Sequence, residues 1–233
     1  MLILFPSNPL EPGRPDYDFE DEWAAAAEAG FEVGVVEVEE LGADPQRAVR
    51  RIKDASSPLR SLYRGWMVSP ELYSALWAAL STTRRGLLYP FGGGSAEGRK
   101  GSGPFSGPAW TRSGGRAGVS RVRRVEPIGV HPQSGMPLSL EYRLLYLYGQ
   151  LLGSELYWEE AAYPDLQPPL EHFGRIAGQI PSPFFTMDVA RGRDEKWWVV
   201  ELGDGQVAGL PAGVPPAEFY ARLAKSFQRI RAC

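Results

Sequence analysis

Short apolar segments alternate with helix-forming segments along the first ninety residues of the chain. An apolar run at residues 2–5 leads through a turn-rich loop to an alanine-rich segment at residues 19–29, which Gly30 closes as a helix. The same alternation predicts further strands at residues 32–38, 61–65 and 86–89, and helices at residues 46–54 and 70–80. Because strands and helices alternate, we predict a small doubly wound α/β domain over residues 1–90.

The second half of the chain has longer extended segments that follow one another with few helices between them. We predict extended segments at residues 121–128, 140–148, 150–159, 184–190 and 196–202, and helices at residues 170–179 and 216–232. This order indicates an α+β domain with an antiparallel sheet over residues 121–233.

Residues 91–120 separate these two domains and differ from both in composition. They hold ten of the chain's 27 glycines and show no apolar periodicity, which predicts a loop or a disordered linker. Lys100 lies here, where glycine-rich backbone could cradle a phosphate, although a solvated linker lysine is the commoner case. The abrupt change of composition is also typical of a shifted reading frame in GC-rich coding DNA, and that alternative stays open.

The composition limits the partners and the location that we expect. Lys and Arg total 25 against 28 Asp and Glu, so the net charge of -3 favours neither nucleic acid nor a membrane as partner. The single cysteine, Cys233, suits a reducing compartment, and the first residues show no basic leader and too short an apolar run for a spanning helix. We therefore expect a cytoplasmic protein that acts on a small-molecule or protein partner.

Carboxylates lie in and after two predicted strands of the second half, where a buried sheet would favour apolar residues. If these strands form a hairpin whose turn is centred on Asp194 and Glu195, Asp188 faces Glu201 on one side of the sheet. Opposed carboxylates repel unless a cation lies between them, and Mg²⁺ takes hard oxygen ligands of this kind. Asp204, in the following turn, could supply a further oxygen. The alternative is an exposed hairpin whose acids pair with nearby arginines, because a slip of one residue separates the faces.

A second group of charged residues lies in the extended segment at residues 140–148. Strand alternation places Glu141 and Arg143 on one face. The guanidinium of Arg143 is suited to a phosphate oxygen or a carboxylate, because its fork donates two parallel hydrogen bonds. The alternative is an arginine that pairs with Glu141 or Glu155 across the sheet.

Two further residues are candidates for contact with a substrate. Arg64 ends a strand of the first domain, and ligands of open α/β sheets bind outside such carboxyl ends. A structural ion pair of Arg64 is an equally good interpretation. His131 lies in a loop with proline and glycine neighbours, where it could touch substrate or simply be solvated.

Several segments together resemble the ATP-grasp superfamily, in particular a group of bacterial ATP-grasp proteins. These segments are LEYRLLYLYGQLL, FFTMDVARGRDEKWWVVELGDGQVAGLP, VEPIGVHPQSGMPLSLEYR, LFPSNPLEPGRPDYDF and LYRGWMVSPELY. They cover most of the chain outside the glycine-rich segment. The resemblance implies a Rossmann-like pre-ATP-grasp domain at residues 1–90 and the carboxy-terminal lobe of an incomplete ATP-grasp domain at residues 121–233.

The resemblance also implies an activity and a set of site residues. It implies an ATP-dependent ligase that activates a small-molecule or peptide carboxylate as an acyl phosphate, which an amine or similar nucleophile then captures, with ATP and Mg²⁺ as cofactors. Asp188 and Glu201 match the metal-binding acids, and Arg143 matches the arginine that approaches the phosphates. Glu126 matches an acid near the ribose hydroxyls, and Glu141 and Lys100 are further nucleotide-binding candidates.

Two departures from the family pattern leave other functions open. A metal-binding Asn normally stands two positions after Glu201, whereas this chain has Gly203 followed by Asp204. The chain has only four lysines, and none stands in a strand-like setting where phosphate-binding lysines are expected. The alternatives are a nucleotide-binding or protein-interaction module without chemistry, or a truncated inactive relative. A shortened lobe would also expose strand edges, which favours pairing of two chains as a homodimer.

Overall fold

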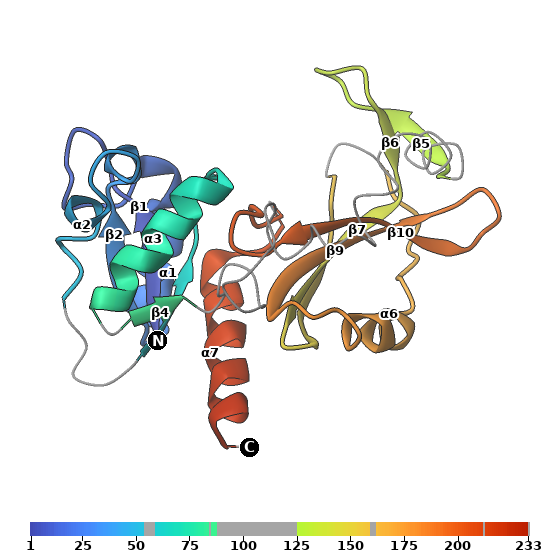
Figure 1. The fold of residues 1–233 in the computed structure, drawn as a ribbon. Coiled ribbons are helices and arrows are strands. Elements are labelled where there is room, and N and C mark those ends of the chain that lie inside the picture. Colours follow the sequence, from blue (N-terminus) through green and yellow to red (C-terminus); the bar gives the residue numbers. More distant parts are fainter. Residues whose placement is uncertain (54–58, 84, 88–124, 159–161, 212, 233) are drawn as a thin grey trace, which may run out of the picture. The chain divides into compact units, whose positions relative to one another are not determined.

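A computed structural model of the chain describes residues 1–53, 59–83, 85–87, 125–158, 162–211 and 213–232 (Figure 1). The chain divides into two compact units, Met1–Gly107 with Pro216–Ala224 (unit 1) and Pro108–Pro215 with Lys225–Cys233 (unit 2). The linker expected at residues 91–120 lies outside the described residues, as does Lys100. Within the described ranges, no helix combines the length and the hydropathy that a membrane span requires.

Unit 1 is built on a four-stranded parallel sheet with the strand order β2-β1-β3-β4. Its elements in chain order are β1 (Leu2–Pro6), a short 3-10 helix η1 (Tyr17–Phe19), α1 (Glu20–Glu28), β2 (Glu32–Val36), η2 (Val38–Glu40), α2 (Pro45–Ala48), β3 (Leu59–Tyr63), α3 (Pro70–Thr82) and β4 (Arg85–Leu87). Right-handed crossovers place α1 on one face of this sheet and α2 and α3 on the other. The doubly wound arrangement predicted from the sequence is confirmed.

Local sequence explains the central strand and the helix boundaries of unit 1. Every residue of β1 is buried, as in a central strand of a parallel sheet that is covered on both faces. Helix α3 begins where the hydroxyl of Ser69 accepts a hydrogen bond from the backbone N–H of Leu72. The helix predicted at residues 46–54 ends early, at Ala48, because the chain then turns and buries Val49 in the core.

Unit 2 contains a four-stranded antiparallel sheet with the strand order β10-β9-β7-β8 and a separate two-stranded sheet. Its elements are β5 (Pro127–Val130), β6 (Pro137–Ser139), β7 (Glu141–Leu147), β8 (Gln150–Leu156), α6 (Leu170–Ala177), β9 (Phe184–Arg191) and β10 (Trp197–Asp204). Helix α7 (Pro216–Ala232) follows, with its first residues in unit 1 and its last in unit 2. The predicted antiparallel sheet is confirmed, whereas the hairpin of β5 and β6 was not predicted because its proline-bounded strands are very short.

Two hairpins set the geometry of the larger sheet. Strands β7 and β8 are joined by Tyr148 and Gly149, which both have positive φ, 47° and 76°, as in the two-residue turns that match the strand twist. Strands β9 and β10 are joined by a turn in which the carboxylate of Asp194 accepts hydrogen bonds from the Lys196 backbone N–H and the Trp198 indole N–H. Strand β9 pairs with both β7 and β10, so it is the strand on which a site can gather side chains from both neighbours.

Candidate functional site

A β-bulge between β9 and β10 brings two of the predicted site residues together. Near the turn, Val199 pairs with Val189, so that a regular ladder would place Val200 opposite Asp188. The register shifts by one residue at this point, and Glu201 becomes the partner of Asp188 instead. The predicted pairing is confirmed, although the turn is centred on Asp194 and only the bulge restores the expected register.

The carboxylate of Asp188 is held by the guanidinium of Arg143 from the neighbouring strand. The Nε of Arg143 donates to Oδ1 of Asp188 at 2.8 Å, and its Nη2 donates to Oδ2 at 2.7 Å. Asp188 is 1% exposed, whereas the side chain of Arg143 keeps 15% of its exposure. The alternative partners of Arg143 that the sequence suggested, Glu141 and Glu155, are therefore not its hydrogen-bond partners.

An aromatic ring also fixes the position of this guanidinium. The Cζ atom of Arg143 lies 4.5 Å from the ring centroid of Tyr157, within the range of a cation–π interaction. Burial alone would lower the pKa of Arg143, but the hydrogen bonds and charge of Asp188 outweigh burial and raise the pKa above its ordinary value. Arg143 is therefore a fixed, fully charged group with its Nη1 still available to an anionic ligand.

Carboxylates outnumber cations on this side of the sheet, which we name the Asp188 face after its central residue. Glu201 lies exposed beside Asp188, and Glu155 is the cross-strand partner of Arg143 on the other side. Glu141 shares the face, where its carboxylate accepts a hydrogen bond from the Ser139 hydroxyl at 3.1 Å. Burial, and then the charge of Asp188, raise the pKa of Glu141 above its ordinary value. The local excess of negative charge favours a bound cation.

The space next to Asp188 explains why position 203 is glycine. Gly203 pairs with Thr186 on the same face, and a Cβ atom at position 203 would lie 2.5 Å from the Oγ1 of Thr186. That contact is too short for any side chain unless Thr186 moves. The Oγ1 is buried and makes no hydrogen bond within the described part of the chain. Thr186 thus occupies the place where the family pattern has a ligand side chain.

Asp204 does not join the other two acids. It is the partner of Phe185, so strand alternation places its side chain on the opposite face from Asp188 and Glu201. Its carboxylate accepts hydrogen bonds from the backbone N–H of Gln206 at 2.9 Å and from the side-chain amide of the same residue at 3.3 Å. The structure therefore gives Asp204 a role in the turn that follows β10.

The remaining predicted residues lie apart from this face. Arg64 follows β3 in unit 1, where it is 1% exposed and makes a two-point ion pair with Glu22. In unit 2, Glu126 is exposed, and its backbone N–H donates to the carbonyl of Arg191. His131 lies in the turn between β5 and β6, where its Nδ1 accepts hydrogen bonds from two backbone N–H groups of the same turn.

The donors present on the Asp188 face fit a metal that also binds substrate oxygens. Among the described residues, no group of three or more His, Cys, Asp or Glu side chains could hold a metal by itself. Asp188 and Glu201 do, however, form an adjacent carboxylate pair, and Mg²⁺ is commonly held by one or two carboxylates plus phosphate oxygens. The pair is therefore compatible with a magnesium ion that arrives with a nucleotide.

A family comparison identifies the superfamily of the chain. The model of an ATP-grasp domain family, the third family of its clade, matches residues 102–223, which is more than half of the sequence. The chain belongs to this ATP-grasp family. The match covers all residues of the Asp188 face, and it confirms the ATP-grasp resemblance of the sequence. ATP-grasp membership supports ATP-dependent ligase chemistry at a general level.

Solved ATP-grasp structures are similar to nearly the whole chain. The ATP-grasp ligase PsnB, complexed with minimal precursor, Mg and ADP, has 10% sequence identity and a TM-score of 0.50, covering 98% of this chain and 96% of that chain. The D-cycloserine synthetase DcsG has 13% identity and a TM-score of 0.45, with 97% and 98% covered. The macrocyclase MdnB from Microcystis aeruginosa MRC has 13% identity and a TM-score of 0.39, with 97% of each chain covered. No curated protein matches the sequence.

Sequence reasoning missed two residues that shape the ATP-grasp site. Tyr157 was only a residue near the end of a strand, and its contact with Arg143 depends on how β8 continues past its last paired residue. Thr186 lies two positions before Asp188, and this spacing alone could have placed it on the same face. What the sequence could not show is that Thr186 and Gly203 are direct partners, because that pairing depends on the bulge.

Proposed function

We propose that the protein is an ATP- and Mg²⁺-dependent ligase that activates a carboxylate as an acyl phosphate, which an amine or similar nucleophile then captures. The observation that carries the proposal is the juxtaposition of Asp188, Glu201 and Arg143 on one face within the ATP-grasp family match. The face provides oxygen ligands for a metal and a guanidinium for a phosphoryl group, which are the two kinds of group that phosphoryl transfer requires.

The two carboxylates have unequal parts in this proposal. Glu201 is exposed and makes no ion pair with another described residue, so it can bind an incoming metal without losing such a contact. Asp188 is buried and held by Arg143, which fixes its orientation toward the site. A magnesium ion bound here would neutralise phosphate charge. Glu201 would contribute the accessible ligand, and Asp188 would contribute the fixed one.

Arg143 is the candidate for stabilising the transferring phosphoryl group. Its Nε and Nη2 bind Asp188, and its Nη1 makes no hydrogen bond in the described part of the chain. The ring of Tyr157 and the carboxylate of Asp188 hold the guanidinium in place before any ligand arrives. A preorganised cation of this kind stabilises developing charge without reorganisation during the reaction.

The substrate is proposed to be a small-molecule or peptide carboxylate. PsnB is complexed with its precursor, which favours the inclusion of peptides among the substrates to be screened. Arg64 is not favoured as the residue that receives the carboxylate, because its fork is engaged by Glu22. His131 and Glu126 stay candidates for contact with substrate and nucleotide.

Calorimetric titration with ATP tests the proposal without knowledge of the substrate. ATP should bind in the presence of Mg²⁺ and bind much more weakly without it. Glu201→Gln should weaken Mg²⁺-dependent binding about tenfold or more, because the exposed metal ligand is lost. Glu195→Gln is the matched control, since Glu195 lies in the same hairpin and is 82% exposed at its turn. Equal metal-dependent affinity in all three proteins would refute the metal site.

A nucleotide-binding module without chemistry is the second candidate function. One observation favours it: both oxygens of Asp188 are already engaged by Arg143, and Gly203 adds no third ligand. ADP release distinguishes the two functions. Release that exceeds the rate of Glu201→Gln supports the ligase, whereas Mg²⁺-dependent binding with no release above that rate supports the module.

A further inference from the structure

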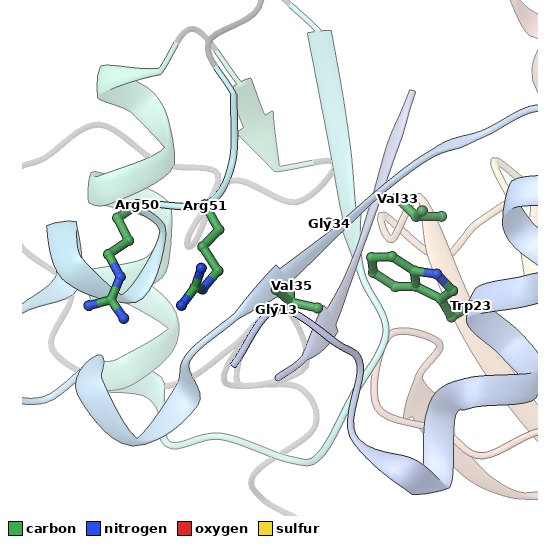
Figure 2. A pocket seen from close by; sticks show the side chains of 7 residues that line it. All are labelled: Gly13, Trp23, Val33, Gly34, Val35, Arg50 and Arg51. Carbon is green, nitrogen blue, oxygen red and sulfur yellow. The ribbon is translucent and has the colours of Figure 1, made fainter. Parts of the chain in front are cut away.

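A second candidate binding site lies in unit 1, on residues that the ATP-dependent function does not use. A pocket of about 560 Å³ lies at the edge of the parallel sheet, and this volume is in the range of ligand sites. Its lining is formed by Gly13, Trp23, Val33, Gly34, Val35, Arg50 and Arg51. Figure 2 shows the two arginines at one end of the pocket and Trp23 at the other, with residues of β2 between them.

The backbone of β2 gives this pocket an unpaired strand edge. The N–H of Glu32 donates to Met1 and the carbonyl of Val36 accepts from Ser7, so these residues of β2 point toward β1. Because backbone groups alternate along a strand, the N–H and C=O groups of Val33 and Val35 point away from β1. Strand β2 ends the sheet order, and both outward-pointing residues line the pocket. The edge is thus open to a further strand.

Two arginines give the same pocket a positive charge. The Nη2 of Arg50 donates to one oxygen of Glu37 at 2.9 Å, and the Nε of Arg51 donates to the other at 3.2 Å. Glu37 is almost buried, while the two arginine side chains keep 40% and 42% of their exposure. One carboxylate therefore orients two guanidiniums and neutralises only one of them. Their other N–H groups make no hydrogen bond within the described residues, and they can bind a second anion.

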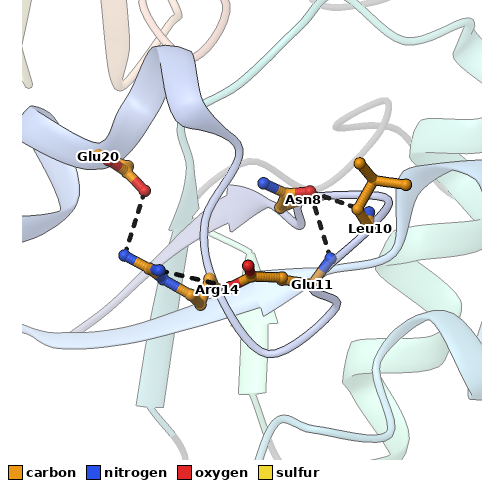
Figure 3. Close-up of polar contacts among 5 residues, drawn as sticks. All are labelled: Asn8, Leu10, Glu11, Arg14 and Glu20. Carbon is orange, nitrogen blue, oxygen red and sulfur yellow. Dashed lines mark hydrogen bonds and ion pairs between the residues drawn. The ribbon is translucent and has the colours of Figure 1, made fainter.

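The remaining walls of the pocket are apolar and fixed. Trp23 is half-buried, and its ring packs 5.7 Å from that of Phe5, which leaves part of the indole for a ligand. Gly13 lies in a loop that is closed by short-range contacts: Asn8 accepts two backbone hydrogen bonds, and Arg14 pairs with two glutamates (Figure 3). This wall is therefore formed before any ligand binds.

We propose that this pocket docks an extended, acidic peptide segment of a partner protein. The segment adds to the edge of β2 by main-chain hydrogen bonds with Val33 and Val35, and one of its carboxylates binds Arg50 and Arg51. An apolar side chain of the segment packs on Trp23. The unpaired edge selects an extended backbone, and the excess guanidinium selects an acidic side chain. This docking is independent of ATP and of the Asp188 face.

Fluorescence anisotropy with a labelled peptide of alternating valine and glutamate residues tests the proposal. The full chain should bind this probe saturably in the absence of ATP and Mg²⁺. A matched valine and glutamine peptide should bind about tenfold more weakly, because the charge-assisted hydrogen bonds are lost. A probe with N-methylated backbone amides should also bind about tenfold more weakly, because it cannot pair with a strand.

Variants of the protein locate the probe. Arg50→Gln with Arg51→Gln should weaken binding about tenfold, whereas Arg47→Gln, a neighbouring arginine outside the pocket lining, should leave it within about twofold. Val33→Pro removes an outward N–H without breaking the ladder to β1, and it should also weaken binding. Glu201→Gln should bind the probe like the unmodified chain, which separates this docking from the ATP-dependent function.

Three results would overturn the proposal. The first is no saturable binding of the acidic probe by the folded chain. The second is equal binding of the N-methylated probe, which would leave a simple carboxylate contact rather than strand addition. The third is a dimer that forms through β2, detected by analytical ultracentrifugation as an association that Val33→Pro abolishes and excess probe does not displace. If the double arginine variant fails to fold, Val33→Pro and the N-methylated probe still decide the matter.

Discussion

Each unit of the protein contains a two-point arginine–carboxylate pair beside an aromatic ring, and the two pairs differ in what surrounds them. In unit 1, Arg64 binds Glu22 with two hydrogen bonds of 3.0 Å and lies 5.6 Å from the ring centroid of Phe219. In unit 2, Arg143 binds Asp188 in the same manner and lies 4.5 Å from the ring centroid of Tyr157.

The pair in unit 1 is closed, and the pair in unit 2 is open. The side chain of Arg64 is 1% exposed, and the hydroxyl of Tyr220 donates to Glu22 at 2.7 Å, so the carboxylate is capped by a third group. Arg143 keeps 15% exposure and has further carboxylates as neighbours, of which Glu201 is exposed. The same chemical pair therefore holds structure together in one unit and leaves charge available to a ligand in the other.

The closed pair also explains why Arg64 is not available as the substrate receptor that its position suggested. It follows β3 at the carboxyl end of the parallel sheet, between strands that run in the strand order β2-β1-β3-β4 and close to the switch point where ligands of such sheets bind. In this protein, Phe219 and Tyr220 of α7 contact the arginine and its partner there. Burial raises the pKa of Tyr220 well above its ordinary value, so the hydroxyl stays a donor.

Matched isosteric substitutions should break the two pairs unequally, and this is the largest effect we expect. Glu22→Gln should lower the free energy of unfolding by about 3–5 kcal/mol, because it leaves the buried charge of Arg64 without its carboxylate. Asp188→Asn should cost only about 1–2 kcal/mol, because Arg143 is less buried and other carboxylates lie near it. Urea unfolding followed by circular dichroism measures both.

Activity should respond in the reverse order. Asp188→Asn should reduce ADP release by a factor on the order of 100, whereas Glu22→Gln should leave the rate per folded molecule nearly unchanged. Equal losses of stability in the two variants would contradict the distinction between a closed and an open pair.

The sequence predicted most of the fold because the two halves differ in apolar periodicity. The apolar run of β1 and the alternating strands of unit 2 each have a pattern that only one kind of sheet satisfies. The failures are local. The helix expected at residues 46–54 shortened where Val49 turned into the core, and the β5–β6 hairpin has too few residues to show a period.

The sequence predicted the site less well, since a site depends on register. The pairing of Asp188 with Glu201 was found from an assumed turn, but no pattern signalled the bulge at Val200 that produces it. Asp204 was placed with the two acids because it is near in sequence, while alternation sends it to the other face. The partner of Arg143 was not identified because three carboxylates were within reach of a strand neighbour, and only the packing distinguishes them.

The exchange of a ligand residue for glycine near the open pair gives a test of intermediate size. Gly203→Asn should lower the free energy of unfolding by about 1–3 kcal/mol, because its Cβ atom overlaps the Oγ1 of Thr186. Adding Thr186→Ala should recover part of that loss, which a double-mutant cycle from urea midpoints measures. The control is Gly209→Asn, where a Cβ atom meets nothing within 4 Å. Strictly additive effects of the two substitutions would show that Thr186 is not what excludes a side chain at position 203.

The smallest effect that we expect concerns the pH dependence of the open pair's surroundings. Burial and the charge of Asp188 raise the pKa of Glu141, so the folded protein binds its proton more tightly than the unfolded chain does. The stabilising contribution of this group is therefore complete below the ordinary glutamate pKa of about 4.3 and is lost as the pH rises through the higher folded value. Glu141→Gln removes this loss, so the free energy of unfolding of the variant should fall less across that window, by at most ~1.4 kcal/mol per pH unit. Urea midpoints at a series of pH values measure the difference, with Glu195→Gln as control because Glu195 is exposed. A pH profile of Glu141→Gln that runs parallel to that of the unmodified chain would mean that Glu141 is not strained by the open pair, and the excess negative charge would then have to be carried by Glu201 and Glu155 alone.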